Sequence, residues 1–519
     1  MRNCCFKPSN VRSLWFGNVI LVLFLSFVCH RAGLIVQAAE TTTNEASTRP
    51  AGSGNPQIAV IGGGIGGTSA AHFLRKNLGS SAVIDLYEPN VIGGRVGTIN
   101  IDGRDYESGG SIIHPDNKYM VNFREEFGFK KSEGGNSLLS FYNGEEFVFT
   151  ESQYAVVTLL RMLWRYGMDC FKIFSLVKSM LSSFSRIYQL QDNGETFNTP
   201  SELLDAMEKD TFVRWAHTPI QSVLHDLGYS DRFIDEFVSV AARVNYGQST
   251  NITAFAGMVS VAGVMPGLWA VQGGNKQIPQ ALMKSSGAMW HHARVNTIKK
   301  TTGEETKFEV TATAPQTNQE LTAEYDMVVV ATPLTPGVGS NIEFQGFAPA
   351  ISPFSGWYQR TVATFIHGQP NPEAFGKEPG DYLPDVLTTC NVSQKIRSLS
   401  ENFQVDITED NVNVDAVYKV FSSEQLTDEQ MNSLFVSRKS SKAVDWLAYP
   451  HYTENDDLPS FVLSDGVFYI NGIEWAASAM EMSVIGARNC ALLATKHWQH
   501  TKGIPSETQE IKTEVKREL

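Results

Sequence analysis

Cysteine is scarce in this chain of 519 residues, and only 19% of its residues are charged. Three of the six cysteines lie before residue 30, so at most one disulfide can form among Cys170, Cys390 and Cys490. The fold must therefore depend on its hydrophobic core rather than on cross-links. Neither Cys-x-x-Cys nor His-Glu-x-x-His occurs, and the eleven histidines are scattered. The sequence accordingly predicts no metal site.

Basic residues are outnumbered as well. The chain has 42 Lys and Arg against 55 Asp and Glu, which gives a formal net charge of −13. Binding of nucleic acid needs a basic face, so this balance argues against nucleic acid as the main partner. A hydrophobic content of 42%, with 30 Phe, 16 Tyr and 9 Trp, supplies a large core and excludes wholesale disorder. The length predicts two or three packed units.

Long apolar runs are absent, and the nearest approach to one lies close to the N-terminus. Residues 19–29 form an apolar run of eleven residues after a basic start. That length suits a signal peptide and falls short of the ~20 residues of a membrane-spanning helix. Small residues at 36–38 fit a cleavage site, so residues 1–39 are predicted to be a signal peptide and residues 40–56 a flexible lead-in. An uncleaved anchor is the alternative.

A secreted chain invites two further predictions. Sequons at Asn251 and Asn391 predict N-glycosylation, and Asn391 is the better candidate because the apolar neighbourhood of Asn251 suggests shielding. The polar tail, residues 499–519, ends in Lys516–Leu519, which is close to the Lys-Asp-Glu-Leu retrieval address. Its Arg517 replaces an acid by a base, so a solvated charged tail is the preferred interpretation.

The strongest pattern in the chain begins at Gln57. An apolar, partly β-branched run, Gln57–Ile61, predicts a buried parallel strand, and a helical pattern over 68–78 and a second strand over 82–87 follow it. Glycines with the spacing Gly-x-Gly-x-x-Gly connect the first strand to the helix, and these are Gly62, Gly64 and Gly67. Strand, turn, helix, strand and a terminal acid in this order predict a dinucleotide-binding fold.

Each residue of the fingerprint has a physical task. Gly62 allows the tight turn, Gly64 lets the backbone approach a pyrophosphate, and Gly67 lets the helix pack close to the strand. The free N–H groups at the helix N-terminus attract the phosphates. Glu88, 21 residues past Gly67, can accept hydrogen bonds from a ribose hydroxyl, and its charge disfavours the 2′-phosphate of NADP.

The residues after Glu88 distinguish between the dinucleotides. Gly93, Gly94 and Arg95 follow the second strand, and Tyr106–Gly110 comes soon afterwards. Here the sequence resembles flavoproteins of the amine-oxidase and Rab-GDP-dissociation-inhibitor superfamily, whose oxidases place a Gly-Gly-Arg turn against FAD. The resemblance implies FAD as the cofactor, with contacts from this turn and from Gly110. Without the fingerprint, the two glycines would indicate only an ordinary turn.

Two later segments fit the same superfamily. Tyr325–Leu334 is a buried strand of the kind that rejoins the nucleotide-binding domain. Gly466–Trp475 is a strand and turn that leads into a helix rich in small residues, Ala476–Leu493, and Glu474 in this turn is a predicted cofactor contact. The fold class is α/β: a Rossmann-like FAD-binding domain with an inserted mixed α+β substrate domain that is partly helical.

Two segments are predicted to be inserted in the cofactor-binding domain. Residues 154–190 of the first segment hold more apolar side chains than one amphipathic face needs. They form either the core of a helical subdomain or, in part, an apolar tunnel or a peripheral membrane contact. The expected parts are FAD-binding residues 57–150, a helical substrate subdomain 151–265, a return 266–340, a second substrate part 341–465 and a closing strand and helix 466–498.

Resemblance to the prenylcysteine oxidase family, also called prenylcysteine lyases, extends over nearly all of residues 57–498. The blocks that carry it are Ile58–Gly67, Ala71–Leu74, Tyr106–Gly109, Arg232–Asp235, Tyr246–Ser249, Ala254–Gly257, Gly273–Lys276 and Glu474–Ser478. The resemblance implies an FAD-dependent thioether oxidase of the lysosome. Such an enzyme converts farnesylcysteine or geranylgeranylcysteine, oxygen and water into cysteine, a prenyl aldehyde and hydrogen peroxide. The sequence departs from the family pattern at Asn251–Thr253, which stands between the blocks Tyr246–Ser249 and Ala254–Gly257.

Oxidised flavin carries the difficult step of such a reaction by accepting a hydride, so no obvious catalytic set is required. His114 and Trp475 are candidates for the face of the flavin. His114 is equally well explained as a structural hydrogen-bonding group, and Trp475 is better explained by packing. Two other functions stay open: a flavin oxidase that acts on an amine, and a non-catalytic prenyl-binding protein like the Rab-GDP-dissociation inhibitors.

Overall fold

A six-stranded sheet forms the centre of the nucleotide-binding part. The computed structural model describes residues 54–132, 137–303, 305–339, 341–390, 395–407 and 416–504. The predicted signal peptide, the sequon at Asn391 and the C-terminal tetrapeptide lie outside these ranges. In spatial order the strands are β18 (Val462–Ser464), β19 (Val467–Tyr469), β11 (Met327–Val330), β1 (Gln57–Ile61), β2 (Val83–Tyr87) and β7 (Met289–His291). All neighbouring pairs are parallel except β18 with β19.

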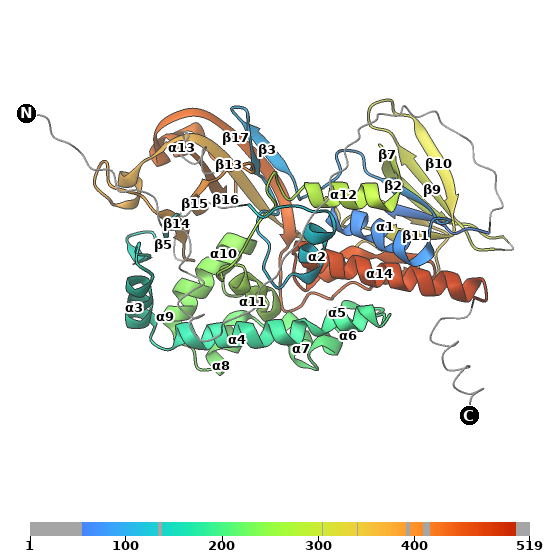
Figure 1. Cartoon of the computed structure of the whole chain (residues 1–519), viewed down its shortest axis with the longest axis horizontal. Coiled ribbons are helices and arrows are strands. Elements are labelled where there is room, and N and C mark those ends of the chain that lie inside the picture. The colour runs from blue at the N-terminus through green and yellow to red at the C-terminus, as the bar shows by residue number, and fades with distance from the viewer. Residues whose placement is uncertain are drawn as a thin grey trace, which may run out of the picture. The chain divides into compact units, whose positions relative to one another are not determined.

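Buried apolar residues explain why this sheet forms. Four residues of β1 and all four of β11 are buried, as expected for parallel strands that are covered on both faces. Helix α1 (Ile65–Leu78) contacts both α14 (Met480–Thr501) and α12 (Gln277–Ser286), and α14 also contacts α2 (Lys118–Glu126). Figure 1 shows α1, α12 and α14 next to β2 and β11. The predicted α/β fold with a Rossmann-like domain is confirmed.

Three further sheets complete the strands. The order in the second sheet is β10 (Glu320–Tyr325), β9 (Phe308–Thr313), β8 (Arg294–Lys300) and β12 (Glu343–Gln345). The order in the third is β17 (Phe435–Pro450), β13 (Tyr358–Pro370), β16 (Val417–Ser422), β15 (Ile396–Asn402), β14 (Asp385–Thr388), β5 (Leu139–Tyr142) and β6 (Phe147–Thr150). The strands β3 (Thr98–Ile101) and β4 (Arg104–Glu107) form a hairpin. The third sheet therefore joins residues 139–150 to residues 358–450.

Residues 151–265 are mainly helical, as the sequence predicts. The helices are α3 (Ala155–Tyr166), α4 (Asp169–Phe184), α5 (Arg186–Asp192), α6 (Pro200–Met207), α7 (Thr211–Ala216), α8 (Ile220–Asp226), α9 (Asp231–Phe233), α10 (Ser239–Tyr246) and α11 (Ala254–Ala262), with a π-helix at Ile234–Val238. Short helices elsewhere are α13 (Asp428–Leu434) and the 3₁₀ segments Pro372–Phe375 and Ile470–Trp475. No described helix is long and apolar enough to cross a membrane.

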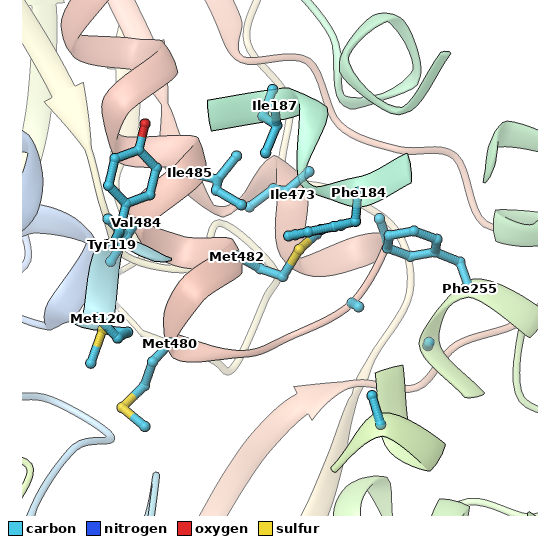
Figure 2. Close-up of a cluster of buried hydrophobic side chains, with 14 of the residues drawn as sticks. Tyr119, Met120, Phe184, Ile187, Phe255, Ile473, Met480, Met482, Val484 and Ile485 are labelled. Atoms are coloured by element: carbon cyan, nitrogen blue, oxygen red, sulfur yellow. The ribbon is translucent and has the colours of Figure 1, made fainter. Parts of the chain in front are cut away.

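The core of these helices is not separate from that of the sheet. One cluster of buried apolar side chains includes Ile58 of β1, Phe255 of α11 and Ile485 of α14. Figure 2 shows part of it, with Met482 near Phe184. The expectation that the helical part has its own core is therefore wrong, because α2, α5 and α14 fill the space between the helices and the sheet.

Candidate functional site

The glycine turn between β1 and α1 is too tightly packed for side chains at two of its positions. A Cβ atom on Gly62, whose φ is +114°, would lie 2.6 Å from the carbonyl oxygen of Ala331. A Cβ atom on Gly67 would lie 1.9 Å from the carbonyl oxygen of Gly62. A Cβ atom on Gly64 would have just one atom of the described residues within 4 Å, the carbonyl oxygen of Gly93 at 3.9 Å. The turn is thus packed on the protein side and open at Gly64, where a ligand's pyrophosphate needs room.

Glu88 follows β2 and lies beside this turn. Its Oε2 accepts a hydrogen bond from the backbone N–H of Gly63 at 3.0 Å, and its Oε1 accepts one from the N–H of Asn90 at 2.9 Å. The indole N–H of Trp290 donates to the carbonyl oxygen of Glu88 at 3.0 Å. These bonds hold the carboxylate at the carboxyl end of the sheet, where Rossmann-like folds bind a ribose. Ribose binding by Glu88 stays a prediction.

The second glycine turn contacts the first. The N–H of Gly93 donates to the carbonyl oxygen of Gly63 at 2.9 Å, and a β-bridge joins Gly93 to Gly64. Gly94 has a φ of +56°, and a Cβ atom there would lie 3.2 Å from the Cα atom of Gly64. Two segments 30 residues apart in sequence therefore form one glycine-lined surface without side chains. That surface fits the backbone of a dinucleotide, and cofactor binding by Gly93 and Gly94 stays a prediction.

Arg95 and Glu474 form an ion pair beside these turns. The second oxygen of Glu474 accepts a hydrogen bond from the hydroxyl of Tyr358 at 3.0 Å, and Arg95 also donates to the carbonyl oxygen of Ala448 at 2.6 Å. Glu474 is almost fully buried, whereas a third of the Arg95 side chain is accessible. Burial alone would lower the pKa of Arg95, but the negative charge of Glu474 raises it above its usual value. Glu474 therefore fixes Arg95 directly. The predicted contact of Glu474 with a cofactor would use lone pairs of its carboxylate that these bonds leave free.

A cavity of about 660 Å³ begins at this ion pair. It brings together several residues predicted from the sequence, and these are Arg95, Gly110, His114 and Glu474. Helices α4 and α11 contribute apolar side chains to its wall, among them Met180, Leu181, Phe184 and Val259. The space is large enough for a ring system and a hydrocarbon chain.

Trp475 does not line this cavity. Its ring packs edge-on against Tyr358 at a centroid distance of 6.1 Å and shares a small buried cluster with Val338. Tyr358 therefore contacts both neighbours in sequence, Trp475 through its ring and Glu474 through its hydroxyl. These contacts favour the packing role of Trp475, and its place at the face of the flavin stays a prediction.

His114 lies in the cavity wall, and its hydrogen bond indicates which ring nitrogen carries the proton. Its Nδ1 accepts a hydrogen bond from the backbone N–H of Asp116 at 3.1 Å. Burial lowers the pKa of His114 below its usual value, so the neutral ring is favoured. A neutral ring that accepts at Nδ1 carries its proton on Nε2. His114 can therefore donate a hydrogen bond into the cavity.

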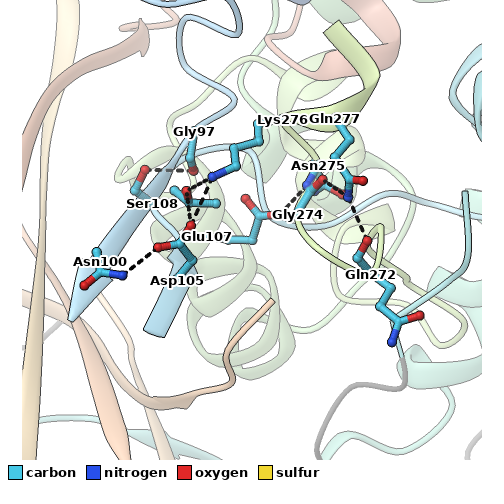
Figure 3. Close-up of polar contacts among 11 residues, drawn as sticks. Gly97, Asn100, Asp105, Glu107, Ser108, Gln272, Gly274, Asn275, Lys276 and Gln277 are labelled. Atoms are coloured by element: carbon cyan, nitrogen blue, oxygen red, sulfur yellow. Dashed lines mark hydrogen bonds and ion pairs between the residues drawn. The ribbon is translucent and has the colours of Figure 1, made fainter. Parts of the chain in front are cut away.

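Glu107 and Lys419 are cavity residues that the sequence did not single out. Oε1 of Glu107 accepts a hydrogen bond from the N–H of Asn275 at 2.6 Å, whereas its Oε2 is buried without a hydrogen-bond partner among the described residues. Figure 3 shows Glu107 between Lys276 and Asn275. Burial raises the pKa of Glu107 to about 7 and lowers that of Lys419 to about 8. The Nζ of Lys419 lies 4.9 Å from the ring centroid of Phe421.

Glu481, in the first turn of α14, is a third buried acid in the cavity wall. Its oxygens accept hydrogen bonds from the N–H groups of Tyr119 and Met120 at 2.8 and 3.0 Å, and from the hydroxyl of Tyr188 at 2.7 Å. Because Tyr119 and Met120 open helix α2, Glu481 stabilises the N-terminus of that helix. Burial raises the pKa of Glu481 to about 7.

The sequon at Asn251 differs from expectation in one respect. Its side chain is exposed rather than shielded, although Ile252 and Thr253 next to it are buried. Asn251 lies in a turn together with Thr250. Glycosylation of Asn251 stays a prediction.

Comparison with known proteins agrees with this geometry. The family model described as prenylcysteine lyase matches residues 149–505, and an NAD(P)-binding Rossmann-like domain matches residues 60–127. Prenylcysteine oxidase 1 of Homo sapiens is 40% identical over 88% of this chain and 93% of its own length. The Bos taurus protein is 39% identical over 88% and 92%, and prenylcysteine oxidase 1-like of Mus musculus is 34% identical over 87% and 93%.

Among solved structures, cyclohexylamine oxidase from Brevibacterium oxydans superimposes with a TM-score of 0.54 at 15% identity, over 86% of this chain and 100% of its own. A putrescine oxidase triple mutant gives 0.54 at 15% identity, over 85% and 99%. These two likenesses describe the fold alone. The sequence likenesses go further and confirm the predicted FAD-dependent oxidoreductase: the chain belongs to the prenylcysteine oxidase family.

Proposed function

We propose that this protein is an FAD-dependent thioether oxidase that degrades the prenylcysteine left by breakdown of prenylated proteins. Its substrate is farnesylcysteine or geranylgeranylcysteine. The carbon between sulfur and the alkene loses a hydride, water adds to that carbon, and the hemithioacetal separates into cysteine and the prenyl aldehyde. Oxygen takes up the two electrons and leaves as hydrogen peroxide. When bound, FAD supplies the hydride acceptor.

The observation that carries this proposal is the composition of the cavity. Its wall includes apolar side chains from α4 and α11, which suit a hydrocarbon chain of ~15–20 carbons. It also includes buried charged residues, among them Glu107 and Lys419. A prenylcysteine combines the same two features, a long hydrocarbon at one end of its sulfur and a zwitterion at the other.

Glu107 and Lys419 suit the zwitterion for an electrostatic reason. More than nine tenths of each residue is buried. The charge of each moves the pKa of the other toward its charged form, but this attraction does not offset the effect of burial and the two make no direct ion pair among the described residues. A buried charge without a close partner is costly, and a ligand that brings the opposite charge relieves that cost. We therefore assign the α-carboxylate of the substrate to Lys419 and its α-ammonium group to Glu107.

The other polar residues orient the substrate and cofactor rather than remove a proton. Arg95, fixed by Glu474 and Ala448, places a positive charge where the cofactor's phosphate or ribityl oxygens would lie. The Nε2–H of His114 can hold an oxygen atom in the cavity, such as that of the attacking water. Loss of hydride from the substrate needs no base, which agrees with these roles.

A direct assay tests the proposal. Purified protein with its flavin should consume oxygen and release peroxide and free thiol with farnesylcysteine, and should do neither with putrescine or cyclohexylamine. Turnover of the amines alone would favour the amine oxidase that the fold likeness allows. A folded, colourless protein that binds farnesylcysteine without turnover would favour the non-catalytic prenyl carrier.

The assignment of Lys419 has its own test. Lys419→Met should raise KM for farnesylcysteine about 10–100-fold, since a charge-assisted bond to a carboxylate is lost. KM for S-farnesylcysteamine, which has no carboxylate, should stay unchanged. Lys377→Met is the matched control, because the Lys377 ammonium lies 4.9 Å from the ring centroid of Phe147 but outside the cavity. An equal loss on both substrates would contradict the assignment.

The proposal extends to the setting of the enzyme. We propose that the protein enters the secretory pathway and acts in the lysosome, on the strength of the leader pattern at 1–39, with glycosylation at Asn391 or Asn251. Molecular oxygen is the second substrate. Prenylcysteine partitions into lipid, so peripheral contact with a membrane belongs to the proposal.

A further inference from the structure

Helix α3 carries a stripe of apolar side chains that no other described element covers. On its inner face Thr158, Met162 and Tyr166 are buried. Its outer face and the start of α4 expose large apolar side chains, and these are Val156, Val157, Leu160, Trp164, Met168 and Phe171. We call these six residues the α3 face. Trp164 is 93% exposed.

The spacing shows that the α3 face is continuous. Val156, Leu160 and Trp164 follow one another at intervals of four, so they stand above one another on the helix. Single exposed apolar residues are common on proteins, but contiguous groups of large ones mark surfaces that bind a partner. Because Trp164 prefers the boundary between hydrocarbon and water, the composition favours a lipid surface.

The charges next to the α3 face point to the same partner. Residues 152–190 contain five basic residues, Arg161, Arg165, Lys172, Lys178 and Arg186, and one acid, Asp169, so the segment carries 5 − 1 = +4. The whole chain carries −13. Arg165, Lys172 and Arg186 form ion pairs with Glu236, Asp169 and Glu208. The Arg161 guanidinium instead donates to backbone carbonyl oxygens, so Arg161 and Lys178 carry the basic charge that these pairs leave over. A local excess of basic charge around exposed apolar side chains is typical of helices that lie on anionic membranes.

We propose that the α3 face docks on an anionic lipid bilayer, with α3 lying in the plane of the interface. The apolar side chains enter the boundary of the acyl chains, while Arg161 and Lys178 remain among the phosphate or serine headgroups. The surface follows from the exposure and charge of these helices. Its use to collect substrate rests on the proposed function.

Helix α4 connects the α3 face to the cavity. Phe171, near its first turn, belongs to the α3 face, and Phe184, its last residue, lines the cavity together with Met180 and Leu181. The thirteen residue steps from Phe171 to Phe184 correspond to roughly 20 Å of helix. Phe171 lies on the exposed face of α4 and Phe184 on its buried face, so the helix separates the membrane surface from the cavity by about this distance.

Vesicle binding tests the docking surface without any turnover. The purified, flavin-loaded protein is mixed with vesicles of phosphatidylcholine containing phosphatidylserine, and with phosphatidylcholine alone. We expect sedimentation with the anionic vesicles, weaker sedimentation with the neutral ones, and a blue shift of the Trp164 emission that Trp164→Phe removes. The double variant Leu160→Glu/Trp164→Glu should bind at least about tenfold more weakly, since two anchors are lost and two repulsive charges are added.

A matched control distinguishes binding through the α3 face from nonspecific binding through any exposed apolar residue. Val436 is 57% exposed and Val156 is 60% exposed, but Val436 lies on β17, away from α3. Val156→Glu should weaken vesicle binding and Val436→Glu should not. Bound flavin and turnover of detergent-dispersed farnesylcysteine should be normal in all these variants, which shows that they are folded. Loss of turnover with normal vesicle binding would contradict the proposed function alone.

Two results would overturn the docking proposal. One is equal vesicle binding by the wild type and Leu160→Glu/Trp164→Glu. The other is a dimer, measured by light scattering, that this double variant converts to a monomer while vesicles bind neither form. The second result would show that the α3 face is covered by another copy of the chain.

Discussion

The carboxylate of Glu88 accepts a hydrogen bond from the backbone N–H of Gly63, at 3.0 Å, and so connects the end of β2 to the glycine turn after β1. A Cβ atom on Gly63 would lie 2.8 Å from the Cβ and Cγ atoms of Glu88, so the two residues are packed as closely as their backbones allow. Residue 88 is therefore held where a ribose must lie if Gly64 faces the pyrophosphate.

Glu88→Arg should remove bound flavin. Arginine has no acceptor for ribose hydroxyls, and charge-assisted bonds of this kind contribute ~1.5–3 kcal/mol, so flavin affinity should fall at least about tenfold. The measurement is flavin released per protein after denaturation, with Glu88→Gln as the milder control because its amide still offers one acceptor. Normal flavin content in Glu88→Arg would show that the adenosine site lies elsewhere.

The sequence could predict this part of the site because its determinants are local. Gly62, Gly64, Gly67 and Glu88 lie within 27 residues, and the two strands and the helix between them fix their relative positions. The Gly-Gly-Arg turn is also local, and its β-bridge to Gly64 follows from short connections.

The rest of the site could not be predicted because it depends on long-range packing. Glu481 accepts hydrogen bonds from Tyr119 and Met120, more than 360 residues earlier in the chain. Lys419 lies in a strand whose pattern gives no reason to single out one lysine, and only the sheet order places it in the cavity. The packing of Trp475 could not be predicted either, because its partners Tyr358 and Val338 lie far earlier in the chain.

Glu474→Gln should destabilise the protein by about 2–3 kcal/mol. The substitution leaves the Arg95 guanidinium without its counter-charge; the loss is below the 3–5 kcal/mol of a fully buried pair because a third of Arg95 is accessible. Denaturant unfolding measures the difference. Glu424→Gln breaks the exposed pair of Glu424 with Lys395 and should cost less than about 1 kcal/mol. Equal effects of the two substitutions would show that the Arg95–Glu474 pair contributes no more than a surface contact.

Glu481 should make the protein less stable as pH rises from about 4.5 to about 7. Its folded-state pKa is raised to about 7, so in this window the native state keeps a proton that the unfolded chain has lost. Raising the pH therefore favours unfolding, and the stability that protonated Glu481 contributes is complete below about pH 4.5. As the pH rises from 4.5 to 7, the unfolding free energy of Glu481→Gln should therefore increase by about 1–3 kcal/mol relative to that of the wild type.

Unfolding curves at several pH values test this. The difference in unfolding free energy between wild type and Glu481→Gln should change with pH over this range. A difference that does not change with pH would mean that Glu481 ionises normally in the folded protein.

His114→Gln separates a catalytic base from a hydrogen-bond donor. The Asp116 N–H bond to Nδ1 leaves the proton on Nε2, so the neutral ring can donate into the cavity but cannot accept a proton there. Glutamine keeps a donor at a similar reach, so kcat should fall by less than about fivefold, whereas removing a general base costs about 10²–10⁴-fold. His114→Ala should lose more activity than His114→Gln, because alanine offers no hydrogen-bond donor.

The pH dependence of kcat gives a second test of His114. Since burial lowers the pKa of His114, the ring stays neutral below the pH at which a free histidine becomes protonated. Protonation of His114 should therefore affect the pH profile of kcat only at a more acidic pH than protonation of an ordinary histidine would. A hundredfold loss in His114→Gln, or the disappearance of an acidic limb from its profile, would identify His114 as a base.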